Sequence, residues 1–203
     1  MAQDFVYPKF EYLTPPEISE QRAGHYPVVI VGAGPVGMST AIDLAQRGQS
    51  VLLIDDDETV SVGSRGVCYA KRTLEVLDRL GLGERVVDKG VSWNVGRTYR
   101  VEEEVFHFNL LPEPDHQRPG MVNLQQYYLE SYLLDRLREL PQVEMRFRNR
   151  VNAVERNPDR ASLVVETPDG EYAVTCDWLV VADGARSPIR HMMGLDIEGK
   201  VFK

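Results

Sequence analysis

The stretch Val28-Val29-Ile30-Val31-Gly32-Ala33-Gly34-Pro35-Val36-Gly37 decides the fold of this chain. Residues 28–31 form an uninterrupted β-branched run, which is typical of a buried parallel strand. After the glycines, apolar residues recur at helical spacing: Met38, Ala41, Ile42, Leu44 and Ala45. Pro35 suits the first turn of a helix, and Gly48 suits its carboxyl end. The stretch therefore predicts a strand, a tight turn and a helix.

A second buried strand, residues 51–54, ends directly before Asp55 and completes a right-handed βαβ unit. In such a unit Gly32 permits the tight turn, Gly34 lets a diphosphate approach the backbone, and Gly37 lets the helix pack close to the sheet. The helix N-terminus attracts the diphosphate, and Asp55 is placed to accept hydrogen bonds from a ribose. We interpret residues 56–58, which are also acidic, as a solvated turn that disfavours a ribose 2′-phosphate.

The rest of the chain predicts an α/β fold with a Rossmann-like parallel sheet. Helices are expected over 70–80 and 126–140, and a further parallel strand over 143–147. Runs 151–156, 161–167 and 171–176 form a predicted three-strand meander between turn signals, and 178–182 is a final buried strand leading into Asp183-Gly184. Residues 91–110 alternate weakly as strands, followed by an irregular connection at 112–120, and we interpret 91–120 as an inserted β-rich piece.

Composition excludes several classes of protein. The 203 residues carry a formal charge of −8, which argues against a nucleic-acid partner. Two cysteines are too few for a disulfide framework, and the histidines at 25, 107, 116 and 191 share no metal-ligand spacing, so no metal site is predicted. Residues 1–26 lack the pattern of a secretory signal and predict a solvated arm or an extended lead-in to the first strand. With no membrane-length apolar stretch either, we expect a cytoplasmic protein.

Four motifs, in order, resemble those of FAD-dependent aromatic-ring monooxygenases, the para-hydroxybenzoate and phenol hydroxylase group. Within that group the chain is most similar to 3-(3-hydroxyphenyl)propionate hydroxylases. The motifs are Gly32–Gly37 with Asp55; Ser64-Arg65-Gly66 ahead of residues 71–75; Asn123-Leu124-Gln125-Gln126 with Leu129-Glu130; and Asp183-Gly184-Ala185-Arg186-Ser187-Pro188-Ile189-Arg190.

The resemblance implies a set of FAD contacts. Arg65 would reach the diphosphate and ribityl region, although it could instead be a surface arginine in a loop. Gln126 would contact the ribityl chain, and Gln125 competes for that role. The Asp183-Gly184 pair would act in both FAD and NAD(P)H handling, with Asp183 also suited to capping a helix. The full expected cofactor set is Gly32, Ala33, Gly34, Pro35, Val36, Gly37, Asp55, Arg65, Gln126, Asp183 and Gly184.

The resemblance also implies an activity: reduction of FAD by NAD(P)H, then transfer of one oxygen atom from O2 to a small aromatic substrate. Enzymes of this group continue well beyond Lys203, so we expect residues 27–203 to be a truncated FAD-binding domain, with 91–120 belonging to a substrate domain. Catalytic residues, substrate and oligomeric state are not predicted. Two alternatives stay open: an FAD- or NAD-linked dehydrogenase or reductase, and a non-catalytic nucleotide-binding fragment.

Overall fold

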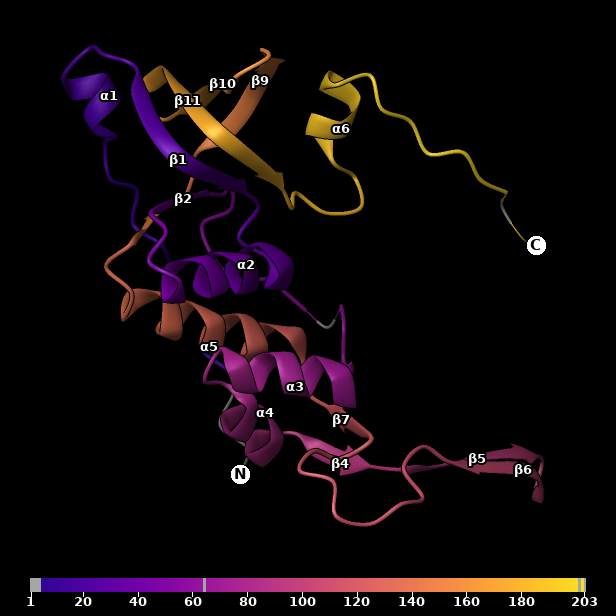
Figure 1. Ribbon diagram of the computed structural model, residues 1–203. Coiled ribbons are helices and arrows are strands. Elements are labelled where there is room, and N and C mark those ends of the chain that lie inside the picture. The colour runs from indigo at the N-terminus through magenta and orange to yellow at the C-terminus, as the bar shows by residue number, and fades with distance from the viewer. Residues whose placement is uncertain (1–4, 64, 201, 203) are drawn as a thin grey trace. The chain divides into compact units, whose positions relative to one another are not determined.

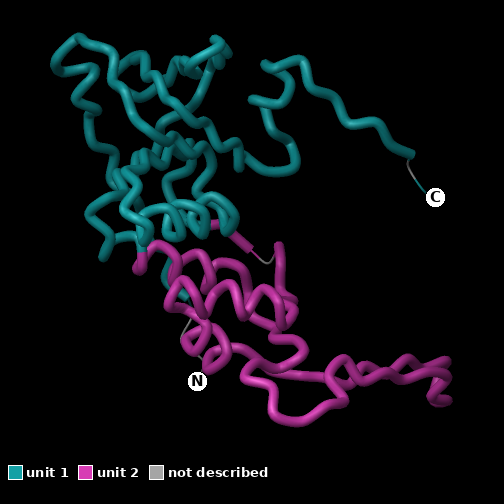
Figure 2. The backbone as a smooth tube through the Cα atoms, viewed as in Figure 1, with its two compact units in different colours: residues 1–60, 137–203 teal, residues 61–136 magenta. Residues whose placement is uncertain are grey.

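A six-stranded mixed sheet organises the first of two units in the computed structural model, which describes residues 5–63, 65–200 and 202 (Figures 1 and 2). This unit contains residues 1–60 and 137–203; the second contains residues 61–136. The strand order is β8-β2-β1-β11-β10-β9. The parallel strands are β8 (Val143–Arg146), β2 (Val51–Ile54), β1 (Gly24–Val31) and β11 (Gly170–Val181). The predicted α/β class with a parallel sheet is confirmed.

The apolar runs of β1 and β2 are buried on both faces, which explains why they do not alternate with polar residues. Val29, Ile30, Leu52 and Ile54 have no exposed surface. Helix α2 (Pro35–Gln46) packs against β1, β2 and β8. Its first residue is the proline expected there, and Gly48 follows its carboxyl end with φ +80°. The βαβ unit predicted from residues 28–55 is therefore present.

The sequence predicts four strands between residues 151 and 182, whereas the structure has three. Strands β9 (Arg150–Arg156) and β10 (Ala161–Thr167) are antiparallel neighbours, as expected. The runs 171–176 and 178–182, however, form one strand, β11, which pairs with β10 through its first half and with β1 over Val174–Val181. Asp177 falls on an exposed position of this strand, so its charge does not interrupt the pairing. Helix α6 (Pro188–Met192) follows β11.

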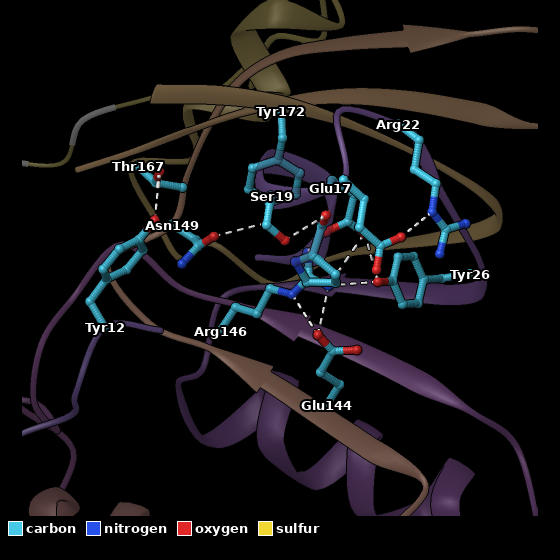
Figure 3. A network of polar contacts seen from close by, with 12 residues as sticks. Tyr12, Glu17, Ser19, Arg22, Tyr26, Glu144, Arg146, Asn149, Thr167 and Tyr172 are labelled. Carbon is cyan, nitrogen blue, oxygen red and sulfur yellow. Dashed lines mark hydrogen bonds and ion pairs between the residues drawn. The ribbon is translucent and has the colours of Figure 1, made fainter. Parts of the chain in front are cut away.

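The N-terminal segment is not a solvated arm, contrary to one of our two expectations. Phe10 stacks on Phe147 with ring centroids 3.8 Å apart. Helix α1 (Pro16–Ser19) places the Glu17 carboxylate against the Arg146 guanidinium of β8, with contacts of 2.9 and 3.3 Å (Figure 3). Both side chains are buried, and Tyr26 joins them by accepting from Arg146 and donating to Glu17 at 2.7 Å. Local sequence patterns could not reveal this pair because its members are 129 residues apart.

The second unit is helical with two small antiparallel sheets. One sheet has the order β3-β7-β4, formed by β3 (Cys68–Ala70), β7 (Met121–Asn123) and β4 (Val91–Trp93). The other is a hairpin of β5 (Val95–Arg100) and β6 (Glu103–Asn109). Its helices are α3 (Lys71–Arg79), α4 (Gly83–Lys89) and most of α5 (Gln126–Arg138). Helices α3 and α5 and the strands within 91–110 were predicted; β3, α4 and β7 were not.

Among the described residues, no helix has both the length and the apolar character needed to cross a membrane.

Replacing Glu17 with alanine should destabilise the first unit strongly. The change removes the buried partner of Arg146 and leaves the more exposed Glu144, and removing one member of a buried ion pair costs about 3 kcal/mol or more. Urea unfolding of the purified chain measures this loss. The control is Arg22→Ala, which breaks the exposed contact between Arg22 and Glu20 and should leave the midpoint unchanged. Equal midpoints for the two variants would contradict a stabilising role for Glu17.

Candidate functional site: the carboxyl edge of the parallel sheet

Three neighbouring parallel strands, β2, β1 and β11, end at the same edge of the sheet. In the register, Val31 lies opposite Ile54 on one side and Val181 on the other. The chain stays paired just beyond these positions, because Gly32 N–H donates to the Ile54 carbonyl and Ala182 N–H donates to the Val31 carbonyl, both at 2.8 Å. The predicted residues Gly32–Gly37, Asp55, Asp183 and Gly184 therefore follow three adjacent strand ends. Open α/β sheets bind their ligands at such an edge.

Gly32 makes this convergence possible. Its φ is +105°, a region that side chains other than glycine rarely adopt. A Cβ atom at this position would lie 2.3 Å from the Ala182 carbonyl oxygen. Gly37 is also required, but mainly for a different contact from the one we expected. A Cβ there would lie 1.8 Å from the Gly32 carbonyl oxygen, whereas the nearest sheet atom, Cβ of Ala182, is at 3.4 Å. Gly37 therefore allows the loop to fold back on itself.

Gly34 differs from these two glycines because its side-chain position is open. It is the N-cap of α2 with an extended φ of −77°, and a Cβ built there meets no described atom within 4 Å. Pro35 and Val36 form the first turn of the helix, with Val36 68 % exposed. The first N–H groups of a helix have no partners within it, and they carry a partial positive charge. The opening beside Gly34 is therefore suited to an anionic group.

The Asp55 carboxylate is hydrogen-bonded to the glycine-rich turn that begins at Gly32. It accepts hydrogen bonds from the N–H groups of Ala33 and Asp57, the latter at 2.8 Å. Burial raises the pKa of Asp55 to about 6, although the two backbone hydrogen bonds act in the opposite direction. Asp56, Asp57 and Glu58 are exposed, as expected for a solvated acidic turn. Asp55 is thus a partly buried carboxylate with a raised pKa that is hydrogen-bonded to the backbone of the glycine-rich turn.

The Asp183-Gly184 pair forms the turn after β11. The Asp183 carboxylate accepts from Ile189 N–H at 3.2 Å, while Ser187 is the residue that caps α6. Gly184 is exposed and has φ +85°, and no described atom lies within 4 Å of a Cβ built there. Arg190 donates to the Ala185 carbonyl at 3.4 Å. Asp183 therefore contacts the first turn of α6 through Ile189 N–H, but the N-cap position that we considered for it belongs to Ser187.

Arg65 and Gln126 belong to the second unit. Arg65 is exposed, and Ser64 lies outside the described residues. Gln126, at the start of α5, is half-buried: its carbonyl oxygen accepts from Gly66 N–H at 3.0 Å and its amide donates to Glu130 at 2.7 Å. Gln125 is exposed. The sequence reasoning gave no role to Glu130, although an acid between the core residues Leu129 and Leu133 was a detectable signal.

Residues 25–202 match a family described as the FAD binding domain. The chain belongs to this family. The match includes the strand ends that converge at the sheet edge and both segments of the second unit that carry Arg65 and Gln126.

Similar proteins are flavin monooxygenases and aromatic hydroxylases. Para-nitrophenol 4-monooxygenase of Pseudomonas sp. (strain WBC-3) is 32 % identical over 177 residues, covering 85 % of this chain and 43 % of that protein. A 3-(3-hydroxy-phenyl)propionate/3-hydroxycinnamic acid hydroxylase of Mycolicibacterium smegmatis is 30 % identical, covering 87 % and 31 %. The crystal structure of p-nitrophenol 4-monooxygenase PnpA from Pseudomonas putida DLL-E4 superposes with a TM-score of 0.82 at 30 % identity, over 89 % of this chain and 46 % of that one. The chain thus spans less than half of each of these relatives.

Substitution of Gly34 by valine should remove nucleotide binding and leave the fold intact, because a Cβ at this position meets no described atom within 4 Å and the side chain would extend into the opening beside α2. The melting temperature should stay within error of the parent while FAD affinity is lost. Gly37→Val is the matched comparison: its side chain would meet the Gly32 carbonyl, so this variant should fail to fold. Unchanged FAD affinity in the Gly34 variant would contradict our placement of the diphosphate.

FAD affinity should depend on pH through Asp55. A ribose hydroxyl binds best to the ionised carboxylate, and the raised pKa means that this form is lost as the pH falls through about 6. Affinity should therefore be constant above that pH and decline below it, measured by fluorescence titration in matched buffers. Asp55→Asn should bind weakly with no such decline, and Asp56→Asn should retain it. A profile in which Asp55→Asn retains the same decline would rule out Asp55 as the titrating group.

Proposed function

We propose that this chain is the FAD-binding portion of a flavin-dependent monooxygenase that hydroxylates aromatic rings. The observation that carries the proposal is the sheet edge, where Gly32 brings three strand ends together and Gly34 leaves an opening at the N-terminus of α2. An extended anionic dinucleotide matches this combination of a close backbone approach, a positive helix end and a neighbouring carboxylate.

Different residues would contact different parts of FAD. Gly32, Ala33, Gly34, Pro35, Val36 and Gly37 would hold the diphosphate, and Asp55 would accept from the adenosine ribose. Asp183 and Gly184, on the turn after β11, would line the next part of the cofactor. From the second unit, Arg65 would add a permanent positive charge for the diphosphate and Gln126 would lie at the ribityl region. These assignments rest on the motifs and on the local geometry of each unit.

The activity rests on the relatives as well as on the site. FAD, when bound, supplies the redox chemistry by which NAD(P)H and O2 are used to hydroxylate an aromatic ring. The residues of this chain would bind and orient FAD. Relatives include a monooxygenase of para-nitrophenol and hydroxylases of 3-(3-hydroxy-phenyl)propionate, which supports a small aromatic substrate. PieE, determined in complex with FAD and substrate, has a TM-score of 0.76 at 25 % identity, covering 87 % of this chain and 33 % of PieE.

We further propose that residues 27–203 make up the FAD-binding domain, with 91–120 as the start of a β-rich substrate domain. Hairpin β5–β6 supports this division, since it exposes Tyr99, Val105 and Phe106 by more than half. Apolar side chains of this size are usually covered in a complete domain.

Excess FAD should raise the melting temperature of the purified chain, and the protein should retain a flavin spectrum after gel filtration. At free FAD about a hundred times its dissociation constant, the stabilisation is about 2.7 kcal/mol. The Gly34→Val variant serves as the control that folds but does not bind. A parent chain with no shift and no retained flavin would contradict the proposal.

A longer form of the protein that also contains the whole substrate domain, loaded with FAD, separates a monooxygenase from a reductase. With NADH or NADPH, a small phenol and O2, a monooxygenase yields hydroxylated product, detected by mass spectrometry after incubation under ¹⁸O2. Oxidation of the nicotinamide without incorporation of the label would favour the reductase alternative.

A further inference from the structure

The second unit contains a buried carboxylate that accepts hydrogen bonds from Ser61 and Gln126. Glu130 lies on α5 with 1 % of its surface exposed. One of its oxygens accepts from Ser61 N–H at 2.6 Å; the other accepts from the Ser61 hydroxyl at 2.8 Å and from the Gln126 side-chain amide at 2.7 Å. Burying a carboxylate is costly unless donors compensate it, so this cluster needs a structural or functional reason.

The orientation of Gln126 follows from the same cluster. Gly66 N–H can only donate, so the Gln126 atom that it faces must be the carbonyl oxygen. The Gln126 amide nitrogen is thereby directed at Glu130. An ionised carboxylate accepts hydrogen bonds and donates none. Gly66, Gln126, Glu130 and Ser61 therefore form one connected set, in which Gly66 donates to Gln126 and both Gln126 and Ser61 donate to Glu130.

These hydrogen bonds attach two points of the described chain, Ser61 and Gly66, to one turn of α5. Ser61 lies at the start of loop 61–66, and Gly66 at its end. A Cβ atom on Gly66 would lie 3.1 Å from the Gln126 oxygen, so the contact is close. Arg65 immediately precedes Gly66 and is exposed. The hydrogen bond to Gly66 thus fixes the backbone from which the Arg65 guanidinium extends.

We propose that Glu130 is a positioning residue for Arg65: it fixes Ser61 directly and Gly66 through the Gln126 amide, so that the guanidinium next to Gly66 is held ready for the FAD diphosphate. This rests on the proposed function, which assigns the diphosphate contact to Arg65. It also gives Gln126 a structural role, since its amide oxygen accepts from Gly66 and its amide nitrogen donates to Glu130. Preorganising Arg65 lowers the entropic cost of binding the cofactor.

Glu130→Gln tests the hydrogen-bond directions with almost no change of shape. An amide at position 130 replaces one accepting oxygen by an NH2 group. That group must face either Ser61 N–H or the Gln126 nitrogen, so two donors oppose each other. Rotating the Gln126 amide only moves the conflict to Gly66 N–H. Every arrangement therefore loses one hydrogen bond: at Ser61 N–H, at Gly66 N–H, or between the side chains at positions 126 and 130 that connect these two contacts.

Hydrogen exchange of the FAD-free chain measures this directly. In Glu130→Gln, peptides covering residues 61–67 should exchange about tenfold faster or more, corresponding to the loss of one hydrogen bond to a charged group. The double variant Gln126→Glu with Glu130→Gln should restore slow exchange, because the carboxylate introduced at position 126 would accept from both Gly66 N–H and the new amide at position 130. Asp135→Asn, on the exposed side of the same helix, should leave exchange unchanged. Unchanged exchange in Glu130→Gln would overturn the inference.

A double-mutant cycle shows whether Glu130 acts through Arg65. Glu130→Gln should weaken FAD binding about tenfold in the parent chain but much less in an Arg65→Ala background. Equal losses in both backgrounds would overturn the positioning role even if the loop is loosened. A parent chain that binds no FAD would instead contradict the proposed function, and the exchange experiment on the FAD-free chain would still decide whether Glu130 holds the loop.

Discussion

The site depends on one constraint: the backbone of Gly32 lies so close to the Ala182 carbonyl that no side chain fits between them. This approach lets the turn after β1 sit directly beside the turn after β11, while Gly32 N–H remains bonded to the end of β2. Gly37 then allows the loop to fold back over the Gly32 carbonyl. With these two positions closely packed, the opening at Gly34 is a defined space at the end of a helix. Tight packing and ligand access are thus produced by neighbouring glycines of the same turn.

The two carboxylates of the candidate site accept hydrogen bonds from the backbone of the protein itself. Asp55 accepts from Ala33 N–H within the glycine-rich turn, and Asp183 accepts from Ile189 N–H within the turn after β11. In the second unit Glu130 does the same for Ser61. Each carboxylate supports a loop that the proposed function places at the cofactor. Preorganised loops of this kind reduce the ordering that must accompany binding.

The sequence predicted those parts of the fold that local patterns determine. The run 28–55 contained a strand, a glycine turn, a helix and a second strand in consecutive order, and the structure has all four. What it could not predict depends on partners far away in the chain. Glu17 resembles any acidic residue of a polar segment until Arg146 is placed beside it. Likewise, Gln126 was recognised from its motif, but its partner Gly66 is 60 residues earlier. The runs 171–176 and 178–182 were predicted as two strands, but they form the single strand β11, which pairs with both β10 and β1.

The central claim is that the carboxyl edge of β2, β1 and β11 binds the ADP portion of FAD. The most direct test is an NMR titration of the ¹⁵N-labelled chain with ADP, which lacks the flavin and ribityl groups. The account predicts that the largest amide shifts occur at Ala33, Gly34, Val36 and Gly37, with smaller shifts around Asp55 and Asp183. Saturable binding whose shifts fall elsewhere in the chain, or no shifts at millimolar ADP, would contradict it.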